Sequence, residues 1–503
     1  MEKEIYAKSN PRITLKQHVA DGLRILECLK ECFPKIPDLA GSHEFWDWIR
    51  LSILLHDTGK AHADFQDLLA SKPNNWNRQR HELFSLSFIF ACLTEHEALE
   101  QISRVVAGHH KPMNSLLHHI RTEYEDPPSE FERQFRRVDV QSVLEMLRDH
   151  FYMTVPDEVQ VVHPRAVVSK YCQEIRSESV TEKHQLLLMT GAFKQCDHLS
   201  SAFIERIEPL SLDRFSFLDQ KHAKLQSEGK DFFSHQKSAA RQLGSAIVTA
   251  PTGSGKTETA LLWVRNQMQN FGQGRVFYVL PFTASINAMW QRLHHETDGF
   301  GEAHVGMLHG NLDAVLYERL FEETGDTRLI GQKIKDVKSA FQSLETPIKV
   351  VTPFQLLKHI FGLKGFEKGI FEMSGGYFIF DEIHAYDPAV FAQIIVLLEY
   401  AMQKLDVRTL VMTATLPGFL KTELRRVAEF SEIIADDALY ERFKRHRLIV
   451  LSGGISDGMD RIARDLIEGQ RVLVVCNTVL QAQQMFDNRV GDMMTIKHLS
   501  KFC

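Results

Sequence analysis

The sequence predicts a multidomain protein in which an all-α helical bundle precedes an α/β unit built on a parallel sheet, followed by a partial second α/β unit. Two patterns support this fold class. Apolar residues recur every three or four positions between residues 12 and 208, which is typical of amphipathic helices. Beyond Phe232, short β-branched runs alternate with helical stretches, which indicates a parallel sheet covered by helices.

The domain boundaries follow from these changes of pattern. A chain of 503 residues is too long for one hydrophobic core, so several domains are expected. We predict a helical domain at 1–208, a linker without steady periodicity at 209–231, a first α/β lobe at 232–445 and an incomplete second lobe at 446–503.

Composition narrows the class of protein. The net charge of -6 means that any nucleic acid must bind a locally basic groove rather than the surface as a whole. Seven scattered cysteines without a C-x-x-C pair indicate reduced thiols. No apolar run is long enough to span a bilayer and the N-terminus has no apolar leader, so we expect a cytoplasmic prokaryotic protein with no membrane partner.

The segment from Ala250 to Thr257 has the features of a phosphate-binding loop, because it follows an apolar strand and precedes a helical run. Glycines in such a loop let backbone N–H groups surround a phosphate, the lysine binds the β and γ phosphates, and the hydroxyl binds Mg²⁺. A plain glycine turn is the alternative, and the strand and helix context disfavours it. The predicted ATP-binding residues are Thr252, Gly253, Ser254, Gly255, Lys256 and Thr257.

A second acidic signal follows in the same half. Asp381 and Glu382 come directly after the predicted strand GYFIF, where an α/β sheet places its ligand site. We expect Asp381 to hold Mg²⁺ and Glu382 to polarise water for ATP hydrolysis. Thr413 and Thr415 follow another strand and offer hydroxyls that relay between nucleotide and nucleic acid, although a simple turn is an equal alternative. Upstream, the amide of Gln236 is a weaker candidate for binding adenine.

The N-terminal half carries a metal-binding pattern. His56 and Asp57 end an apolar helix pattern, and a buried imidazole beside a carboxylate suits a first-row divalent ion. Lys60, close behind them, is expected to neutralise a scissile phosphate, with a solvated lysine as the equal alternative. Each further candidate alone is more often a surface or core residue. These candidates are His18, His81, His109, His110 and Asp197.

Together these donors are enough for two divalent transition metals roughly 4 Å apart, which suits in-line attack on a phosphodiester. The expected catalytic residues are then Asp57 and Lys60 in this half and Glu382 in the other. The sequence leaves the metal open among Mn²⁺, Fe²⁺, Co²⁺ and Ni²⁺.

The motif order in the second half resembles superfamily-two DExH helicases over roughly residues 232–480. The resemblance implies RecA-like lobes and a coupling role for His384 in the DEIH motif, beside Thr413 and Thr415. It also implies sequence-independent contacts with the nucleic-acid backbone. The residues that carry over to these contacts are Pro281, Thr283, Thr352 and Pro353.

The whole order of motifs resembles the type I CRISPR-associated fusion of an HD nuclease with a DExH helicase. His56-Asp57-Thr58-Gly59-Lys60 followed by Phe65-Gln66 matches the HD motif, and His109-His110 matches the histidine doublet. The family's other ligands carry over to His18 and Asp197, with His81 as a histidine near the site. The resemblance implies recruitment to a crRNA-guided surveillance complex, nicking of single-stranded DNA, and ATP-driven degradation.

The resemblance is weakest at the end of the sequence. Residues 446–503 are few for a complete RecA-like lobe, so we expect a truncated second lobe, a doubtful motor, and a partner chain as one source of the missing part. Two alternatives stay open. One is an HD-type nucleotide phosphohydrolase with a regulatory ATP-binding domain, and the other is a truncated DNA-binding fragment without motor activity.

Overall fold

The structure is a computed structural model, and it describes residues 4–124, 129–174, 178–324, 327–444, 454, 458–470, 472 and 474–487. The chain divides into two compact units, residues 1–440 and 441–503, which are considered separately. Among the described residues, no helix is both long and apolar enough to cross a membrane.

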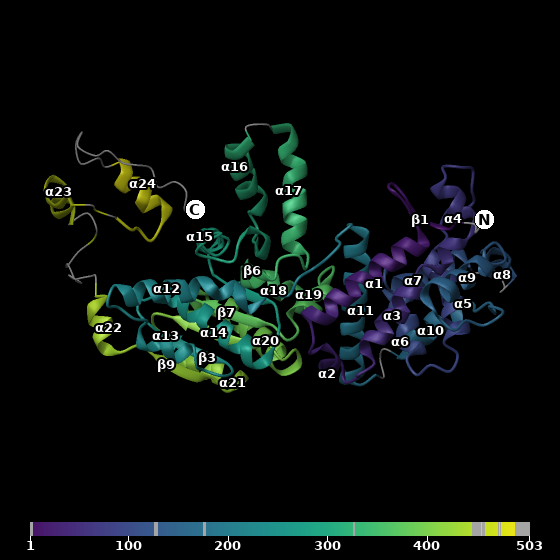
Figure 1. Ribbon diagram of the computed structural model, residues 1–503. Coiled ribbons are helices and arrows are strands. Elements are labelled where there is room, and N and C mark those ends of the chain that lie inside the picture. The colour runs from purple at the N-terminus through teal and green to yellow at the C-terminus, as the bar shows by residue number, and fades with distance from the viewer. Residues whose placement is uncertain are drawn as a thin grey trace. The chain divides into compact units, whose positions relative to one another are not determined.

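The N-terminal part of the first unit is a helical bundle preceded by a small antiparallel hairpin of β1 (Tyr6–Ser9) and β2 (Arg12–Thr14) (Figure 1). This agrees with the predicted all-α class, apart from the hairpin. The helices are α1 (Leu15–Cys32), α2 (Ile36–Ala40), α3 (Phe45–Leu55), α4 (Ala63–Leu69), α5 (His81–Cys92), α6 (Leu99–Ala107), α7 (Met113–Glu123), α8 (Ser129–Phe135), α9 (Val140–Phe151), α10 (Pro164–Glu174) and α11 (Val180–Ser201), with a 3-10 turn, η1 (Thr58–Ala61).

Helix α11 is the longest of these helices, and local sequence explains where it begins. Ser179 accepts a hydrogen bond from the N–H of Glu182, and the Glu182 side chain accepts one from the N–H of Ser179, so two unpaired donors of the first turn are satisfied. Leu188, Phe193 and Leu199 are buried, on more than one side of the helix. The helix therefore passes through the core and carries Asp197 into it.

The second part of the first unit is a parallel sheet with the strand order β5-β6-β4-β7-β8-β3-β9. All its pairings are parallel, as the sequence predicts. The strands are β3 (Ala246–Thr249), β4 (Val276–Val279), β5 (Val305–Leu308), β6 (Ile348–Val351), β7 (Tyr377–Asp381), β8 (Arg408–Thr413) and β9 (Ser431–Ile434). The predicted strands coincide with β3, β4, β6, β7 and β8. The prediction missed β5 and β9, the two edge strands, whose sequences VGML and SEII include residues with low strand propensity, a glycine and a glutamate.

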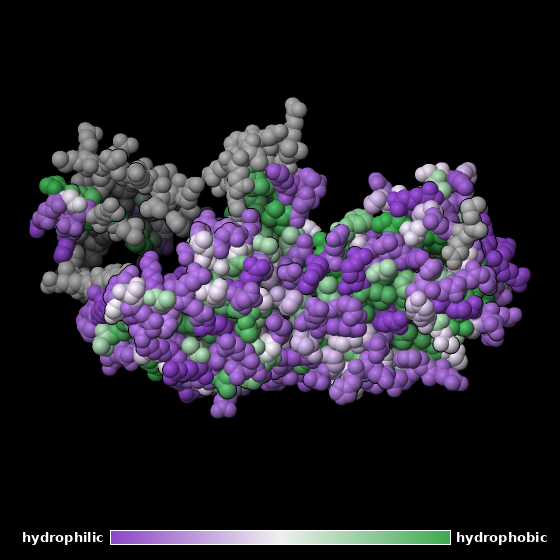
Figure 2. Space-filling view, viewed as in Figure 1, coloured by the Kyte–Doolittle hydropathy of each residue, from purple (hydrophilic) through white to green (hydrophobic). Residues whose placement is uncertain are grey.

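Helices accompany the strands, and those between consecutive strands provide the crossovers that a parallel sheet needs. They are α13 (Ser234–Ala239), α14 (Lys256–Phe271), α15 (Thr283–Leu293), α16 (Leu312–Thr324), α17 (Thr327–Gln342), α18 (Pro353–Ile360), α19 (Phe366–Met373), α20 (Pro388–Lys404), α21 (Gly418–Val427) and α22 (Asp437–Arg442). Helices α16 and α17 pack on each other and project from the sheet (Figure 1). The face in Figure 2 is mostly hydrophilic, with scattered hydrophobic residues.

The bundle and the sheet part meet through α11 and α19. Gly191 lies at the contact, where a Cβ would stand 2.5 Å from the Glu367 carbonyl oxygen and 2.7 Å from the Phe371 Cβ. Only glycine permits this approach. The Nζ atom of Lys194 lies 2.9 Å from Glu367 Oε1 on the same face of α11.

The predicted linker at 209–231 contains more regular structure than its sequence suggests. It forms a 3-10 turn, η2 (Leu212–Phe215), and helix α12 (Ser216–Ser227). Tertiary contacts fix this helix where periodicity is weak. Asp219 accepts a 2.7 Å hydrogen bond from Arg265 of α14, and Lys221 forms an ion pair with Glu258.

The second unit contains α23 (Met459–Ile467) and α24 (Val479–Asp487), where the sequence predicts helices. The apolar runs RLIVLS, from Arg447, and RVLVVCNT, from Arg471, predict two strands. The first run lies outside the described residues, and residues 472 and 474–476 of the second are not in a strand. A strand needs a hydrogen-bonded neighbour, and none is formed by the described residues here.

Candidate metal centre and nucleotide site

The histidines and acids of the N-terminal half converge on Asp57. His56 ends α3, His18 projects from α1, and both place Nε2 atoms 3.2 Å from Oδ2 of Asp57. Asp197 lies on the same side, with its Oδ1 atom 3.6 Å from His18 Nε2 and 4.0 Å from His56 Nε2. These four side chains form the first donor group.

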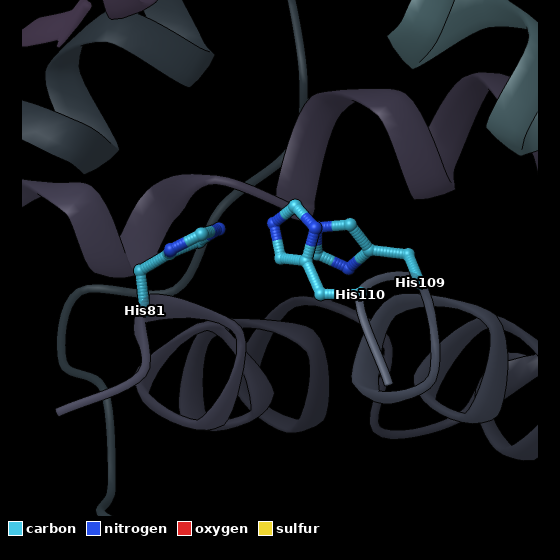
Figure 3. A group of neighbouring side chains, drawn as sticks. All are labelled: His81, His109 and His110. Atoms are coloured by element: carbon cyan, nitrogen blue, oxygen red, sulfur yellow. The ribbon is translucent and has the colours of Figure 1, made fainter. Parts of the chain in front are cut away.

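A second donor group lies on the other oxygen of Asp57. The Nε2 atom of His81, at the start of α5, is 3.0 Å from Asp57 Oδ1. Figure 3 shows the rings of His109 and His110, after α6, beside the ring of His81. Ligand atoms of these three histidines lie within 4.8 Å of one another. Asp57 thus lies between two groups of potential ligands.

Backbone hydrogen bonds fix the tautomers of two of these histidines. His56 Nδ1 donates to the Ile53 carbonyl oxygen at 2.8 Å, and His109 Nδ1 donates to that of Val106 at 2.5 Å. The neutral rings therefore present bare Nε2 atoms to the site, as metal ligation requires. Burial lowers the pKa of His109 to about 3, so this ring stays neutral at physiological pH.

A positive neighbour keeps Asp57 ionised. Burial alone raises the pKa of Asp57, but the charge of Lys60 and the contact with His18 outweigh burial and hold the pKa well below its usual range. Lys60 Nζ lies 2.6 Å from Asp57 Oδ2. In this geometry the predicted phosphate-binding lysine neutralises Asp57.

A glycine and a serine shape this loop. A Cβ at Gly59 would lie 2.0 Å from the His81 carbonyl oxygen, so only glycine lets η1 approach α5 this closely. Ser85 Oγ accepts a 2.9 Å hydrogen bond from the N–H of Gly59 and donates one of 2.7 Å to the His56 carbonyl oxygen. Sequence reasoning did not identify Ser85. It also missed Glu82, whose buried carboxylate lies 3.8 Å from His81 Nδ1, because one glutamate beside a histidine is an ordinary helix start.

The phosphate loop connects β3 to α14, as predicted. Gly253 and Gly255 have φ values of +86° and +82°, which favour glycine. Thr252 and Ser254 lie between β3 and α14, and Ser254 is buried. Lys256 Nζ lies 2.5 Å from Oε1 of Glu382.

The two candidate Mg²⁺ ligands, Asp381 and Thr257, are hydrogen-bonded to residues that the sequence did not identify. Tyr278 Oη donates to Asp381 Oδ2 at 3.0 Å, and Arg292 donates to Thr257 Oγ1 at 2.9 Å. The pKa of Asp381 is raised overall, because the effect of burial outweighs the lowering effect of the Tyr278 hydrogen bond. Both partners come from elements far away in the sequence, so no local motif marks them.

Gln236 is hydrogen-bonded to the phosphate loop. Its Nε2 atom donates to the Gly255 carbonyl oxygen at 3.2 Å and its Oε1 atom accepts from the N–H of Phe233 at 2.8 Å. To bind adenine, the Gln236 amide would therefore have to give up these two hydrogen bonds.

The predicted coupling residues form one chain of contacts. Thr413 Oγ1 donates to the Thr415 carbonyl oxygen at 2.7 Å, so it accepts from His384 Nδ1, which lies 2.5 Å away. The same nitrogen is 3.5 Å from Glu382 Oε2. Glu382 has a φ of +53°, an uncommon conformation for a non-glycine residue that often marks a functional site.

The predicted backbone-binding residues follow β4 and β6, neighbouring strands whose carboxyl ends share one edge of the sheet. Pro281 and Thr283 lie between β4 and the start of α15, and Thr352 and Pro353 lie between β6 and the start of α18. They are brought to one edge together with the phosphate loop, since all these strands are parallel.

Comparisons with known proteins agree with this architecture. A family model described as "Cas3, HD domain" matches residues 5–203, and one described as "DEAD/DEAH box helicase" matches residues 233–422. The chain thus joins a region similar to the Cas3 HD domain to a region similar to DEAD/DEAH box helicases. The putative CRISPR-associated nuclease/helicase Cas3 of Methanocaldococcus jannaschii is 27% identical over 251 residues, covering 48% of this chain and 33% of that protein.

A second relative of this chain is the CRISPR-associated nuclease/helicase Cas3 of Methanothermobacter thermautotrophicus, 27% identical over 316 residues, or 60% of this chain and 36% of that protein. The matches thus span about a third of the length of these curated relatives. The fold is similar to the crystal structure of T. fusca Cas3-ATP, with a TM-score of 0.54, 15% identity, and coverage of 96% of this chain and 63% of that one.

Proposed function

We propose that this chain is a metal-dependent nuclease for single-stranded DNA joined to an ATP-dependent DExH motor. In type I CRISPR interference it would nick and degrade target DNA, recruited by a crRNA-guided surveillance complex. The nuclease proposal rests on the position of Asp57, whose two carboxylate oxygens face separate groups of histidines at 3.0 to 3.2 Å. A carboxylate placed in this way suits a bridge between two divalent ions.

The residues present fit such ions. The Nε2 atoms of His56, His81 and His109 are buried and make no hydrogen bond with the described residues. Buried polar atoms without partners are costly, and a divalent ion would satisfy them together. His18, His56, Asp57 and Asp197 would hold one ion. Asp57, His81, His109 and His110 would hold the second.

Bound transition metals such as Mn²⁺, Fe²⁺, Co²⁺ or Ni²⁺ supply Lewis acidity and lower the pKa of a bound water. The protein orients the reactants. Lys60, which lies 2.6 Å from Asp57 Oδ2, would bind a non-bridging phosphate oxygen of the DNA, since this oxygen is anionic like the carboxylate. The Val106 and Ile53 carbonyl groups keep His109 and His56 in the tautomer that ligates.

The nucleotide site performs its chemistry with separate residues. Lys256 would leave Glu382 for the β and γ phosphates of ATP, and Thr257 and Asp381 would hold Mg²⁺ after exchanging Arg292 and Tyr278. Glu382 would then be free to polarise water. Glu382 contacts His384, and His384 contacts Thr413, so this chain of side chains would link the nucleotide site to the strand end that leads to Thr415.

One assay separates this proposal from the alternatives. The purified chain is incubated with circular single-stranded DNA and Mn²⁺, Fe²⁺, Co²⁺ or Ni²⁺, with and without ATP. Metal-dependent cutting without ATP supports the nuclease. Release of phosphate from free nucleotides without DNA cutting would favour a nucleotide phosphohydrolase, and DNA binding without either reaction would favour an inactive fragment.

A further inference from the structure

The N-terminal hairpin places a lysine beside the metal centre. Gln66 accepts from the N–H of Tyr6 at 2.9 Å and donates to the carbonyl oxygens of Tyr6 and Lys60 at 2.9 and 2.7 Å. This side chain fastens β1 to η1, the turn that directly follows Asp57. Lys8 on β1 lies near enough to Lys60, Asp57 and Asp197 for their charges to influence its pKa.

The ammonium group of Lys8 has no polar partner in the described part of the chain. Its Nζ atom is buried, makes no hydrogen bond with the described residues and has none of their carboxylates within 4.0 Å. A buried ammonium with unused donors is costly, so an anionic ligand would stabilise it. Its contact is with the ring of Phe203, whose centroid is 5.4 Å away.

Phe203 follows the end of α11, the helix that carries Asp197. The N–H of Phe203 donates to the Ser200 carbonyl oxygen at 3.2 Å, and the N–H of Ile204 donates to that of Leu199 at 3.0 Å. These two bonds form a Schellman motif, in which the position of Phe203 normally holds glycine. Phe203 has a φ of +60° and its side chain is 51% exposed. Because half of the side chain is exposed, its burial contributes little free energy to offset the unfavourable backbone conformation of Phe203.

We propose that Lys8 and Phe203 form a nucleotide-binding subsite at the edge of the metal centre. The Lys8 ammonium binds a backbone phosphate, and the Phe203 ring stacks on the base of an adjoining nucleotide of single-stranded DNA. Aromatic rings stack on every base, so the subsite accepts any sequence. This inference rests on the proposed nuclease function and adds a substrate contact to it.

The backbone of Phe203 allows a substitution that removes the ring without harming the fold. Phe203→Gly places the preferred residue at this position, so thermal stability should stay equal or rise. Affinity for a fluorescein-labelled dT12 strand, measured by anisotropy in EDTA, should fall by about 5- to 150-fold. Affinity for a strand of the same length made of abasic sites should not change. A loss that is equal for both strands would overturn the stacking role.

Tyr152 provides a matched control. It has a φ of +54° at the end of α9, its side chain is 89% exposed, and among the described residues no cation lies over its ring. The positive φ by itself thus does not mark a binding site. Tyr152→Gly should leave dT12 affinity unchanged. If it weakens dT12 binding as much as Phe203→Gly does, the subsite is wrongly placed.

The phosphate contact is tested at Lys8. Lys8→Met should weaken binding to dT12 and to the abasic strand alike, and it should reduce the slope of log affinity against log salt concentration by about 0.7. Lys8→Arg should keep the parent slope. An unchanged slope in Lys8→Met would overturn the contact.

Failure of the proposed function is detected separately on the parent protein. With Mn²⁺, the parent should release p-nitrophenol from bis(p-nitrophenyl) phosphate, which has no base to stack. An inactive parent would contradict the nuclease function itself. An active parent with unchanged dT12 affinity in both Phe203→Gly and Lys8→Met would contradict only the subsite.

Discussion

The Nζ atom of Lys256 and the Oε1 atom of Glu382 lie 2.5 Å apart, so the phosphate-loop lysine and the acid after β7 neutralise each other across the nucleotide site. ATP must compete with Glu382 for this lysine. Glu382→Gln removes the competing charge, so we expect tighter binding of a fluorescent ATP analogue, by roughly tenfold, together with loss of any hydrolysis. Weaker binding in this variant would show that Glu382 does not compete with phosphate.

Lys256→Ala should have the opposite effect on binding. It removes the cation that meets the β and γ phosphates, so affinity for the same analogue should fall at least tenfold. Cutting of DNA in the absence of ATP should persist, because the metal centre uses other residues. The variant Lys224→Ala, which removes a lysine outside the phosphate loop, is the control. Equal analogue affinity in both variants would contradict the assignment of the phosphate loop.

Asp57→Ala should abolish metal-dependent DNA cutting and preserve binding of the ATP analogue. The loss follows because both donor groups share this carboxylate. Calorimetric titration with Mn²⁺ should show loss of the sites, not merely weaker ones. Asp149→Ala, at an exposed position on α9, should cut like the parent. Retained cutting by Asp57→Ala at the same metal concentration would exclude Asp57 as the bridging ligand.

Gly59→Ala should disturb the second donor group. The added Cβ would lie 2.0 Å from the His81 carbonyl oxygen, so α5 must shift and move His81 away from Asp57. We expect weaker Mn²⁺ binding and a lower melting temperature. Gly418→Ala is the control, because nothing lies within 4 Å of a Cβ there. A variant with parental stability and metal affinity would mean that η1 adapts without cost.

His62 should make stability depend on pH. Burial lowers its pKa to about 4, so between pH 6.5 and pH 4 the unfolded state binds a proton that the folded state does not. Stability is therefore lost as pH falls through this window. Between pH 7.5 and pH 5.0 the loss from this group is about 2 kcal/mol, measurable by urea unfolding with EDTA present.

His62→Asn tests this assignment. His62 Nδ1 accepts from the N–H of Asp64 at 3.1 Å as the N-cap of α4, and asparagine also serves as an N-cap. The variant should fold, and its stability should change less between the two pH values. A pH dependence equal to that of the parent would place the effect on other groups.

The sequence by itself determined the order of the parts, and it predicted candidate residues for each site. Periodicity separates helices from strands because side-chain direction repeats every 3.6 or 2 residues. The phosphate loop and the His56-Asp57 pair are local motifs whose chemistry needs adjacent residues, so they could be recognised without a fold. The spacing of His18, His81, His109 and Asp197 carries no such signal, and their predicted role came from the family resemblance.

Only the tertiary structure decided which atoms meet. It put His18 and His81 on opposite oxygens of Asp57, and it paired Lys256 with Glu382 and Tyr278 with Asp381. It also brought Lys8 to Phe203 from opposite ends of the helical part. These pairs are far apart in the chain, and packing of whole helices and strands, which no local pattern encodes, sets their distances.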